Sequence, residues 1–434
     1  MAMQYHSVRL DKERCRGCTT CLKRCPTEAI RVRDGRAHII DEKCIDCGEC
    51  IRVCPYHAKV ATTDPLASIT RFPYRIALPA PSLYGQFRGV NSIDKILGGL
   101  RNLGFDAVFE VARGADLVSQ AVAARMADLG RPKPLISAAC PAIVRLIQVR
   151  FPGLIDHIID IRQPMEAAAL MAKREFCLAN QVPEKDVGCF FITPCPAKMT
   201  AIRNPIGHET SALDGAISIL EIYGLLASQI RNPQQTTEKL ATSTLLGIGW
   251  ANSGGECAAI GQENSMAVNG IENVIHVLEE LENNKLNDLA FFEGQACVGG
   301  CVGGSLTFEN GFVAKNTIRK LIERMEREGE SPVATPASDA ELCAVNNTQP
   351  VLPNSSMRLD ENIVVAMRKM ERIDELTAKL PGYDCGACGS PTCRSMAEDV
   401  VAGYAGELDC IHKLKERLQV MAQQMVELAT TTRK

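Results

Sequence analysis

The sequence lacks an excess of positive charge, an apolar leader and any apolar run long enough to span a bilayer. Lysine and arginine number 48 against 51 aspartates and glutamates, so the formal net charge is −3. A protein without a basic field has no electrostatic footprint for nucleic acid. The first residues, MAMQYHSVRL, contain no apolar signal core, and a membrane helix needs about 20 apolar residues. We therefore expect a cytoplasmic protein with neither nucleic acid nor a membrane as partner.

The 20 cysteines are the unusual feature of the composition. A chain of 434 residues can build several domains with a sizeable core, so it does not need disulfides as a small secreted scaffold does. Thiols in a reducing cytosol stay unpaired, and clustered thiols in such a protein are typical of metal sites. The spacing of the cysteines then indicates which metal.

The N-terminal residues contain two copies of the spacing C-x2-C-x2-C-x3-C-P, the pattern of bacterial two-cluster ferredoxins. In this pattern three cysteines bind one [4Fe–4S] cluster and the fourth crosses to the other cluster. The expected ligand sets are Cys15, Cys18, Cys21 and Cys54 for one cluster, and Cys44, Cys47, Cys50 and Cys25 for the other. A zinc ribbon also uses C-x2-C pairs, but it leaves no role for the triplets. We expect residues 1–62 to form an α+β ferredoxin domain.

A third group of cysteines lies near the C-terminus, in a predicted small helical domain at residues 359–410. Its members are Cys385, Cys388, Cys393 and Cys410. The first three are predicted to lie in a Gly/Pro-rich loop, and Cys410 at the end of the helical stretch that follows. Four thiolates suit a [4Fe–4S] cluster, and zinc is the alternative. The segments LPG, CGACG and PTCR resemble a small iron–sulfur domain of several anaerobic redox proteins.

Residues 411–434 are predicted to form a helical tail with an apolar seam. The seam residues alternate at spacings of three and four, as in a heptad repeat: Ile411, Leu414, Leu418, Met421, Met425 and Leu428. Such a seam indicates either a homodimer through this helix or a helix packed on its own chain. Residues 326–358, of low complexity, are predicted to be a linker.

Between residues 73 and 325 short β-type runs alternate with helical stretches, which is typical of an α/β domain. LGFDAVFEV is predicted to be a helix end followed by a strand, and CFFITPCPAK a buried strand ending in a loop. DLVSQAVAARMADLG is predicted to be a helix with Gly130 as its C-cap. Sites in such domains gather in loops at strand ends.

Four cysteines fall in those loops: Cys140 in SAACPAIV, Cys195 in TPCPAKM, and the pair Cys297 and Cys301 in QACVGGCVGG. Four thiolates suffice for a fourth cubane, and no zinc signature has this distribution. The glycines between Cys297 and Cys301 let the backbone approach the bound group closely. From the residues alone, this is a further iron–sulfur site buried in an α/β domain.

The middle segment resembles the catalytic domain of the [FeFe]-hydrogenases. LPAP, LGFDAVFEVARGADL, SAACPAIV, TPCPAK, NSGGECAA and QACVGGCVGG occur in the order of that family. The resemblance implies that Cys140, Cys195, Cys297 and Cys301 bind the cubane of an H-cluster. Cys301 would bridge to a two-iron unit that carries CO, cyanide and a dithiolate amine and that separate maturation proteins build. Lys198 matches the family lysine that hydrogen-bonds a cyanide, and the alternative is a surface lysine.

The departures from the family all concern protons and the pocket. Ala139 stands where active members have a proton-relaying cysteine, and Ala121 and Val122 stand where the next acid is expected. A relay needs titratable groups within hydrogen-bond reach, so two of its steps are missing. The pocket also differs at Thr193 and Gln295, which replace methionines, and at Met165, which replaces a polar residue.

These features predict a slow [FeFe]-hydrogenase that acts as an H2 sensor, of the regulatory type lacking the relay cysteine. Its substrates would be H2 and protons, and a redox or signalling protein would receive its output. One alternative is a ferredoxin-linked turnover hydrogenase subunit with another proton path. The other is an iron–sulfur protein without the two-iron unit, as in cytosolic cluster assembly. Cys177 and Cys189 are predicted to be core residues, and Cys257 is predicted to be structural, with a substitute proton donor as the alternative.

Overall fold

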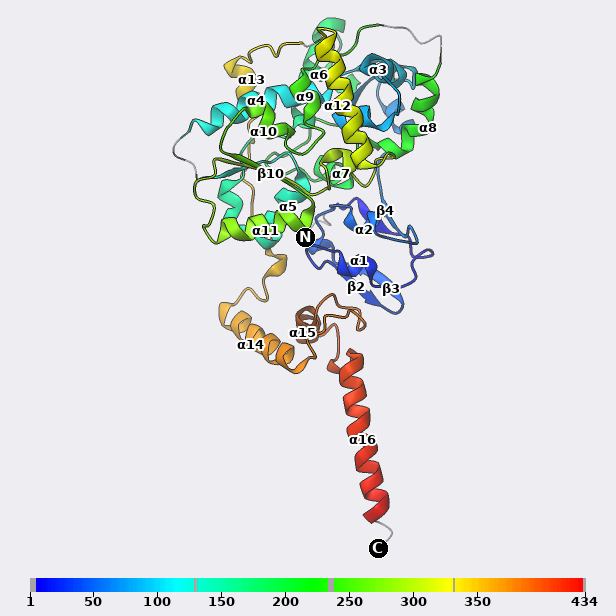
Figure 1. The fold of residues 1–434 in the computed structure, drawn as a ribbon, viewed down its shortest axis with the longest axis vertical. Coiled ribbons are helices and arrows are strands. Elements are labelled where there is room, and N and C mark those ends of the chain that lie inside the picture. Colours follow the sequence, from blue (N-terminus) through cyan, green and yellow to red (C-terminus); the bar gives the residue numbers. More distant parts are fainter. Residues whose placement is uncertain (1–4, 129, 131, 233–237, 331, 432–434) are drawn as a thin grey trace. The chain divides into compact units, whose positions relative to one another are not determined.

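The computed structural model describes residues 5–128, 130, 132–232, 238–330 and 332–431 (Figure 1). The chain divides into two compact units. The first comprises Met1–Val8, Ile45–Gly48 and Ala61–Asn354, and the second Arg9–Cys44, Glu49–Val60 and Ser355–Lys434. Among the described residues, no helix combines the length and apolar composition that a membrane crossing requires.

Two parallel sheets form the framework of the first unit, which confirms the expected α/β architecture. Their strand orders are β6-β5-β8-β9 and β10-β11-β7. The strands are β5 Tyr74–Pro79, β6 Ala107–Val108, β7 Leu135–Ile136, β8 Val187–Thr193, β9 Gly215–Ser218, β10 Ser265–Asn269 and β11 Phe291–Gln295. The central strand β8 reads VGCFFIT and every residue in it is buried. A continuous apolar run of this kind suits a parallel strand covered on both faces.

The helices of the first unit follow these strands along the chain. They are α3 Ile93–Asn102, α4 Val111–Met126, α5 Pro141–Arg150, α6 Pro164–Asn180, α7 Pro196–Arg203, α8 Ile219–Ile230, α9 Leu245–Gly249, α10 Gly255–Ile260, α11 Ile271–Glu282, α12 Gly311–Arg327 and α13 Asp339–Ala344. Three of them, α5, α6 and α7, begin with a proline, whose fixed φ suits the first helical position and whose missing N–H costs nothing there.

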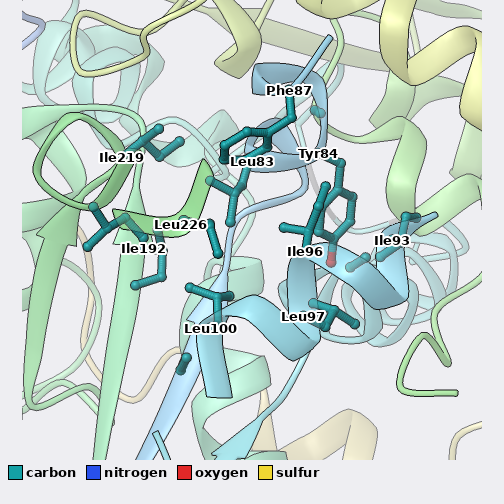
Figure 2. Packing of buried hydrophobic residues seen from close by; sticks show 14 of the residues in the cluster. Leu83, Tyr84, Phe87, Ile93, Ile96, Leu97, Leu100, Ile192, Ile219 and Leu226 are labelled. Atoms are coloured by element: carbon teal, nitrogen blue, oxygen red, sulfur yellow. The ribbon is translucent and has the colours of Figure 1, made fainter. Parts of the chain in front are cut away.

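A large apolar cluster anchors α3 and α8 to the first sheet (Figure 2). Leu83 and Tyr84 lie against Ile96 of α3, and Ile192 at the end of β8 faces the same cluster. The Tyr84 hydroxyl donates a hydrogen bond of 2.9 Å to Glu110, so this buried polar group is satisfied. This packing fixes the carboxyl end of β8, where the site begins.

The predicted helix at residues 116–130 is present, but its ends differ from the expectation. It lies within α4, which starts earlier at Val111 and ends at Met126. The expected C-cap, Gly130, is therefore wrong: Ala127 caps the helix in a right-handed conformation, so no glycine is needed. The segment LGFDAVFEV does pass from the end of α3 into the short strand β6, as expected.

The stretch expected to be a linker is partly ordered against the first unit. Helix α12 runs on to Arg327, and α13 forms within the stretch behind a capping box made by Ser338 and Glu341. Val345 is 1 % exposed, and its carbonyl accepts a hydrogen bond of 2.7 Å from the backbone of Arg162. Low sequence complexity did not reveal this short helix, because its stability comes from the cap and from tertiary packing.

The second unit contains both outlying cysteine groups except Cys47, which falls in the first unit. Its elements include β2 Ile30–Arg33, β3 Arg36–Ile39, α1 Thr20–Lys23, α2 Glu49–Arg52, α14 Ile363–Lys379, α15 Cys393–Val401 and α16 Ile411–Thr431, and β1 Val8–Leu10 pairs with β4 Lys59–Ala61. Strands β2 and β3 form an antiparallel hairpin. Cys393, expected in a loop, is the first residue of α15, and Cys410 comes after a further turn, directly before α16.

A buried carboxylate joins the hairpin to the C-terminal residues of the second unit. Asp399 of α15 accepts hydrogen bonds from Arg31 at 2.6 Å, from Arg33 at 2.9 Å and from Ser390 at 2.7 Å. The backbone N–H of Val32 also donates to the carbonyl of Gly389 at 2.8 Å. Because Arg31 and Asp399 are almost completely buried, each charge depends on the other for solvation.

Helix α16 exposes the seam that the sequence predicted. The side chains of Ile411, Leu414, Leu418, Met421, Met425 and Leu428 are between 40 % and 69 % exposed. The helix extends away from α14 and α15 in Figure 1. The alternative expectation, a helix packed on its own chain, is therefore not what the described residues show.

Without the Asp399 carboxylate, the second unit should unfold far more easily. We expect Asp399→Ala to lower the free energy of unfolding by about 3–5 kcal/mol, since Arg31 would be left buried without a counter-charge. The control is Glu375→Ala, which breaks the exposed pair between Arg372 and Glu375 and should cost at most about 1 kcal/mol. Anaerobic urea titration of the reconstituted protein, followed by circular dichroism, measures both. Equal losses in the two variants would contradict the assigned role.

Candidate functional site

The four cysteines of the middle segment line one cavity in the first unit. Cys140 follows β7, Cys195 follows β8, and Cys297 and Cys301 follow β11, so all four come from carboxyl ends of parallel strands. The cavity has a volume of about 70 Å³. The structure thus brings together the four thiols that the sequence left far apart.

Cys140 and Cys195 have the same local setting. Each has an extended backbone and caps a helix that begins with proline, Cys140 for α5 and Cys195 for α7. The Cys-Pro sequence therefore ends the connection after a strand and starts a helix in a single step. The partial positive charge at a helix N-terminus favours a thiolate at this position.

The glycines after Cys297 are required by the backbone as well as by the cavity. Gly300 has a φ of +101°, and a Cβ there would lie 2.6 Å from the backbone nitrogen of Ser253. A Cβ on Gly304 would lie 2.3 Å from the carbonyl oxygen of Pro194. Both glycines line the cavity. The expectation that they leave room for a bound group is thus only part of their role, because they also let two loops touch.

Lys198 points its ammonium at the four cysteines. Burial alone would lower the pKa of Lys198, but the negative charges of Cys301, Cys195, Cys140 and Cys297 outweigh it and raise the pKa above its ordinary value. The ammonium also donates to the carbonyl of Ala139 at 3.3 Å. Lys198 is thus a cation held inside the cavity, and the alternative of a surface lysine is wrong.

The thiols themselves are poorly suited to stand alone in this cavity. Burial raises the pKa of Cys195 to about 12, although Lys198 opposes the shift, and burial also raises the pKa of Cys301. Several buried sulfurs become thiolates together only if a metal group neutralises them. Soft thiolate ligands in this number select iron–sulfur clusters or related metals. The donor set therefore fits a cluster of the [4Fe–4S] kind.

The residues at the positions where the resemblance implies a proton relay have no titratable side chain. Ala139 lines the cavity, and Ala121 and Val122 are buried in α4 within an apolar cluster that includes Trp250. Met165 also lines the cavity and is fully buried. This part of the cavity wall is apolar, as the sequence suggested.

Thr193 and Gln295 play different parts. Thr193 is buried, accepts a hydrogen bond of 3.2 Å from the backbone N–H of Cys195 and donates one of 2.9 Å to its carbonyl, so it positions that cysteine. Gln295 lines the cavity, and its side-chain oxygen has no hydrogen-bond partner among the described residues. A buried acceptor without a donor indicates a group that the cavity is built to receive.

A pair of buried glutamates lies beside the cavity, and sequence reasoning missed both. Glu256 lines the cavity and accepts a hydrogen bond of 2.5 Å from Ser137, whose oxygen in turn accepts one from the backbone of Ala139. Glu293, in the middle of β11, accepts hydrogen bonds from the backbone of Gly254 and Cys257. A glutamate inside the apolar strand FFEGQ was the signal that could have revealed this pair.

The two glutamates have raised pKa values. Burial, and then the charge of Glu293, raise the pKa of Glu256 to about 8. Burial also raises the pKa of Glu293. For Cys257, burial and the charge of Glu293 raise the pKa to about 12, so it stays a thiol at neutral pH. Glu256 is the titratable side chain of the cavity wall whose proton exchanges near neutral pH.

In the second unit, the cysteines predicted for one ferredoxin cluster lie close together. Burial raises the pKa of Cys21, and the charges of Cys18, Cys54 and Cys15 raise it further, while Lys59 opposes them. Cys50 is affected in the same way by Cys44 and Cys25. The grouping of Cys47 with these residues stays a prediction.

The C-terminal cysteines also share a small cavity. All four of the predicted ligands line it: Cys385, Cys388, Cys393 and Cys410. The backbone N–H of Cys393 donates to Asp384 at 2.6 Å, which holds the start of α15 against the loop. One loop and two helix starts therefore present their sulfurs to one small space.

Comparison with known proteins identifies the first unit. The family profile described as iron only hydrogenase large subunit, C-terminal domain, matches residues 74–265 and 259–305, more than half of the chain. The chain belongs to the iron-only hydrogenase family. A 4Fe-4S dicluster domain matches residues 7–55, and an Fe-S cluster domain matches residues 380–412. These matches support iron–sulfur cofactors in all three parts of the chain.

Individual relatives are distant. The chain is 24 % identical over 271 residues to Iron hydrogenase 1 of Clostridium pasteurianum, covering 51 % of this chain and 46 % of that protein. It is 26 % identical over 106 residues to the cytosolic Fe-S cluster assembly factor NAR1 homolog of Schizosaccharomyces japonicus, covering 24 % of this chain and 21 % of that protein. The chain thus spans less than half the length of either relative.

A solved structure of the [FeFe]-hydrogenase HydA(deltaEFG) shares the fold. It aligns with a TM-score of 0.50 at 16 % identity and covers 67 % of this chain and 98 % of that chain. At this identity the likeness shows the fold and nothing finer.

Proposed function

We propose that the protein is a slow [FeFe]-hydrogenase that senses H2 and passes a redox signal through its iron–sulfur clusters. The observation that carries the proposal is the cavity of the first unit. It combines four cysteines and Lys198 with an alanine at position 139. The metal-binding chemistry is kept, and the usual first step of proton delivery is lost.

In this proposal Cys140, Cys195, Cys297 and Cys301 would hold the cubane, and Cys301 would also hold a two-iron unit inserted by maturation proteins. The two-iron unit, when bound, supplies the site at which H2 is split or formed. Lys198 offers an ammonium donor to an anionic cyanide ligand, a charge-assisted hydrogen bond of the strong kind. The apolar wall that includes Met165 limits water at this end of the cavity.

Because position 139 has no thiol, we assign proton exchange to Glu256. With its pKa raised to about 8, Glu256 holds a proton at neutral pH and releases it at little cost. Its hydrogen bond to Ser137 fixes the carboxyl at the cavity wall. Glu293 is the next acid, since the charges of the two glutamates influence each other. We propose this pair as the proton path, with Cys257 in a structural role beside it.

The second unit supplies the route for the signal. The segments of the ferredoxin clusters and of the C-terminal cluster are joined by the hydrogen bonds of Asp399 to Arg31 and Arg33. Electrons would therefore find cluster sites on both sides of this contact. We propose that α16 then reaches a second copy of the chain or a signalling protein through its exposed seam.

The similarity to NAR1 is the observation that supports the alternative of an iron–sulfur protein without hydrogen chemistry. A second alternative is a turnover hydrogenase subunit, which the Glu256 path would also serve. Sustained H2 evolution by the matured protein at the rate of a turnover enzyme would favour that alternative over the sensor.

The proton path makes a prediction about two substitutions. We expect Glu256→Gln to lower H2 evolution by about 10²- to 10⁴-fold, since an amide cannot exchange a proton. Ala139→Cys should raise it less than about tenfold, equal to about 1.4 kcal/mol of barrier, because Ala121 and Val122 provide no acid behind the new thiol. Wild-type activity should also decline as the pH rises through about 8, because ionised Glu256 no longer donates.

The test is H2 evolution with a chemical reductant, on matured protein with equal cluster content. Glu272→Gln, an exposed substitution on α11, is the control and should have wild-type activity. A hundredfold gain in Ala139→Cys, or full activity in Glu256→Gln, would show that protons take another route.

The seam makes a separate prediction about assembly. Truncation after Cys410 should halve the mass measured by light scattering, because the apolar face of α16 needs a partner helix. Leu418→Glu should have the same effect, and Gln423→Glu, on the opposite side of the repeat, should not. A monomeric wild type would exclude the homodimer and leave a signalling protein as the partner of this helix.

A further inference from the structure

The two cysteine runs of the ferredoxin segment are copies of each other, and the structure repeats with them. Each run ends in Cys-Pro-x-x-Ala, and the alanine N–H donates to the sulfur of the last cysteine: Ala29 to Cys25 at 3.2 Å, and Ala58 to Cys54 at 3.3 Å. The residue after the alanine is Ile30 in the first copy and Lys59 in the second. Both are only 2 % exposed. A lysine thus occupies the buried position at which the other copy has an isoleucine.

The positive charge of Lys59 has no hydrogen-bonded counter-charge among the residues that the structure describes. Its ammonium nitrogen is buried and has no hydrogen-bond partner among the residues that the structure describes. The core of the ferredoxin segment is made of apolar residues and cysteines, including Leu22 and Ala58, the neighbour of Lys59 in sequence. An unpaired ammonium in such a place is costly, so a negative group is expected where the structure holds only protein atoms.

The Lys59 ammonium lies within electrostatic reach of cysteines from both runs. The positive charge of Lys59 acts on Cys21 and Cys54, which belong to one predicted ligand set, and on Cys25 and Cys50, which belong to the other. The charge of Lys59 therefore acts on both sets of sulfurs and not on one alone.

We propose that the Lys59 ammonium is a counter-charge shared by the two ferredoxin clusters. In this role it raises the reduction potentials of both clusters. Each cluster gains one negative charge when it accepts one electron from a chemical reductant, and no proton or bond is exchanged. A fixed positive charge favours the state with more negative charge, and net charge is one of the factors that set cluster potentials. This inference does not depend on the hydrogenase proposal, because it concerns only the ferredoxin segment.

The consequence for function is retention of the electron. Clusters with raised potentials hold an electron that a cluster without the ammonium would pass on. A signalling protein needs a reduced state that persists, whereas a turnover enzyme needs rapid exchange with its electron donor.

The test compares Lys59→Ile, which restores the residue of the other copy, with Lys59→Met, which keeps the length of the side chain. The full chain is reconstituted anaerobically with iron and sulfide, and a dithionite redox titration is followed by electron paramagnetic resonance. At a fixed solution potential, both variants should show about a tenfold lower ratio of reduced to oxidised ferredoxin clusters, a shift of about −59 mV for one electron.

Two controls separate charge from packing. Ile30→Met changes the equivalent core position without a change in charge, and Lys415→Met removes an exposed charge from α16; neither should shift the potentials. Unchanged potentials in both Lys59 variants, or equal shifts in either control, would overturn the proposal. Loss of cluster iron in both Lys59 variants would also overturn it, since Lys59 would then be needed to hold the clusters.

Discussion

The structure depends on one electrostatic constraint: four cysteine sulfurs and one lysine share a buried cavity that protein atoms alone cannot neutralise. The sulfurs come from the carboxyl ends of parallel strands in two sheets, and the Cys-Pro starts of α5 and α7 aim two of them. Glycines at positions 300 and 304 let the loops close around the space. These features have little value in an ordinary α/β protein, and they become useful together when a cationic metal group balances the thiolates.

The same principle recurs in the second unit on a smaller scale. Asp399 balances Arg31 and Arg33 and thereby joins the ferredoxin hairpin to the C-terminal helices. Lys59 is the opposite case, a buried cation whose balance comes from the clusters themselves. In both units a buried charge lies near cysteines that are predicted to bind clusters, and the low dielectric of the interior strengthens its electrostatic effect.

Sequence spacing predicted which cysteines line a common cavity in the first unit and near the C-terminus, since the strand-end loops follow from an α/β pattern and the C-terminal spacing is local. Their role as cluster ligands stays a prediction. Sequence spacing could not predict Glu256 and Glu293, which are 37 positions apart and meet only through tertiary packing. Helix α13 was missed for a similar reason, because its cap and its packing are not visible in composition. Gly130 was expected to cap α4 because glycine is common at helix ends, whereas Ala127 caps the helix in a right-handed conformation.

The central claim is that the cavity of the first unit holds a two-iron unit bound through Cys301. Infrared spectroscopy of the matured protein tests it most directly, because bound CO and cyanide absorb where protein does not. The account predicts CO and cyanide stretching bands in wild type and their loss in Cys301→Ser. A matured wild type that contains its cubane iron but shows no such bands would contradict the account and favour an iron–sulfur protein without hydrogen chemistry.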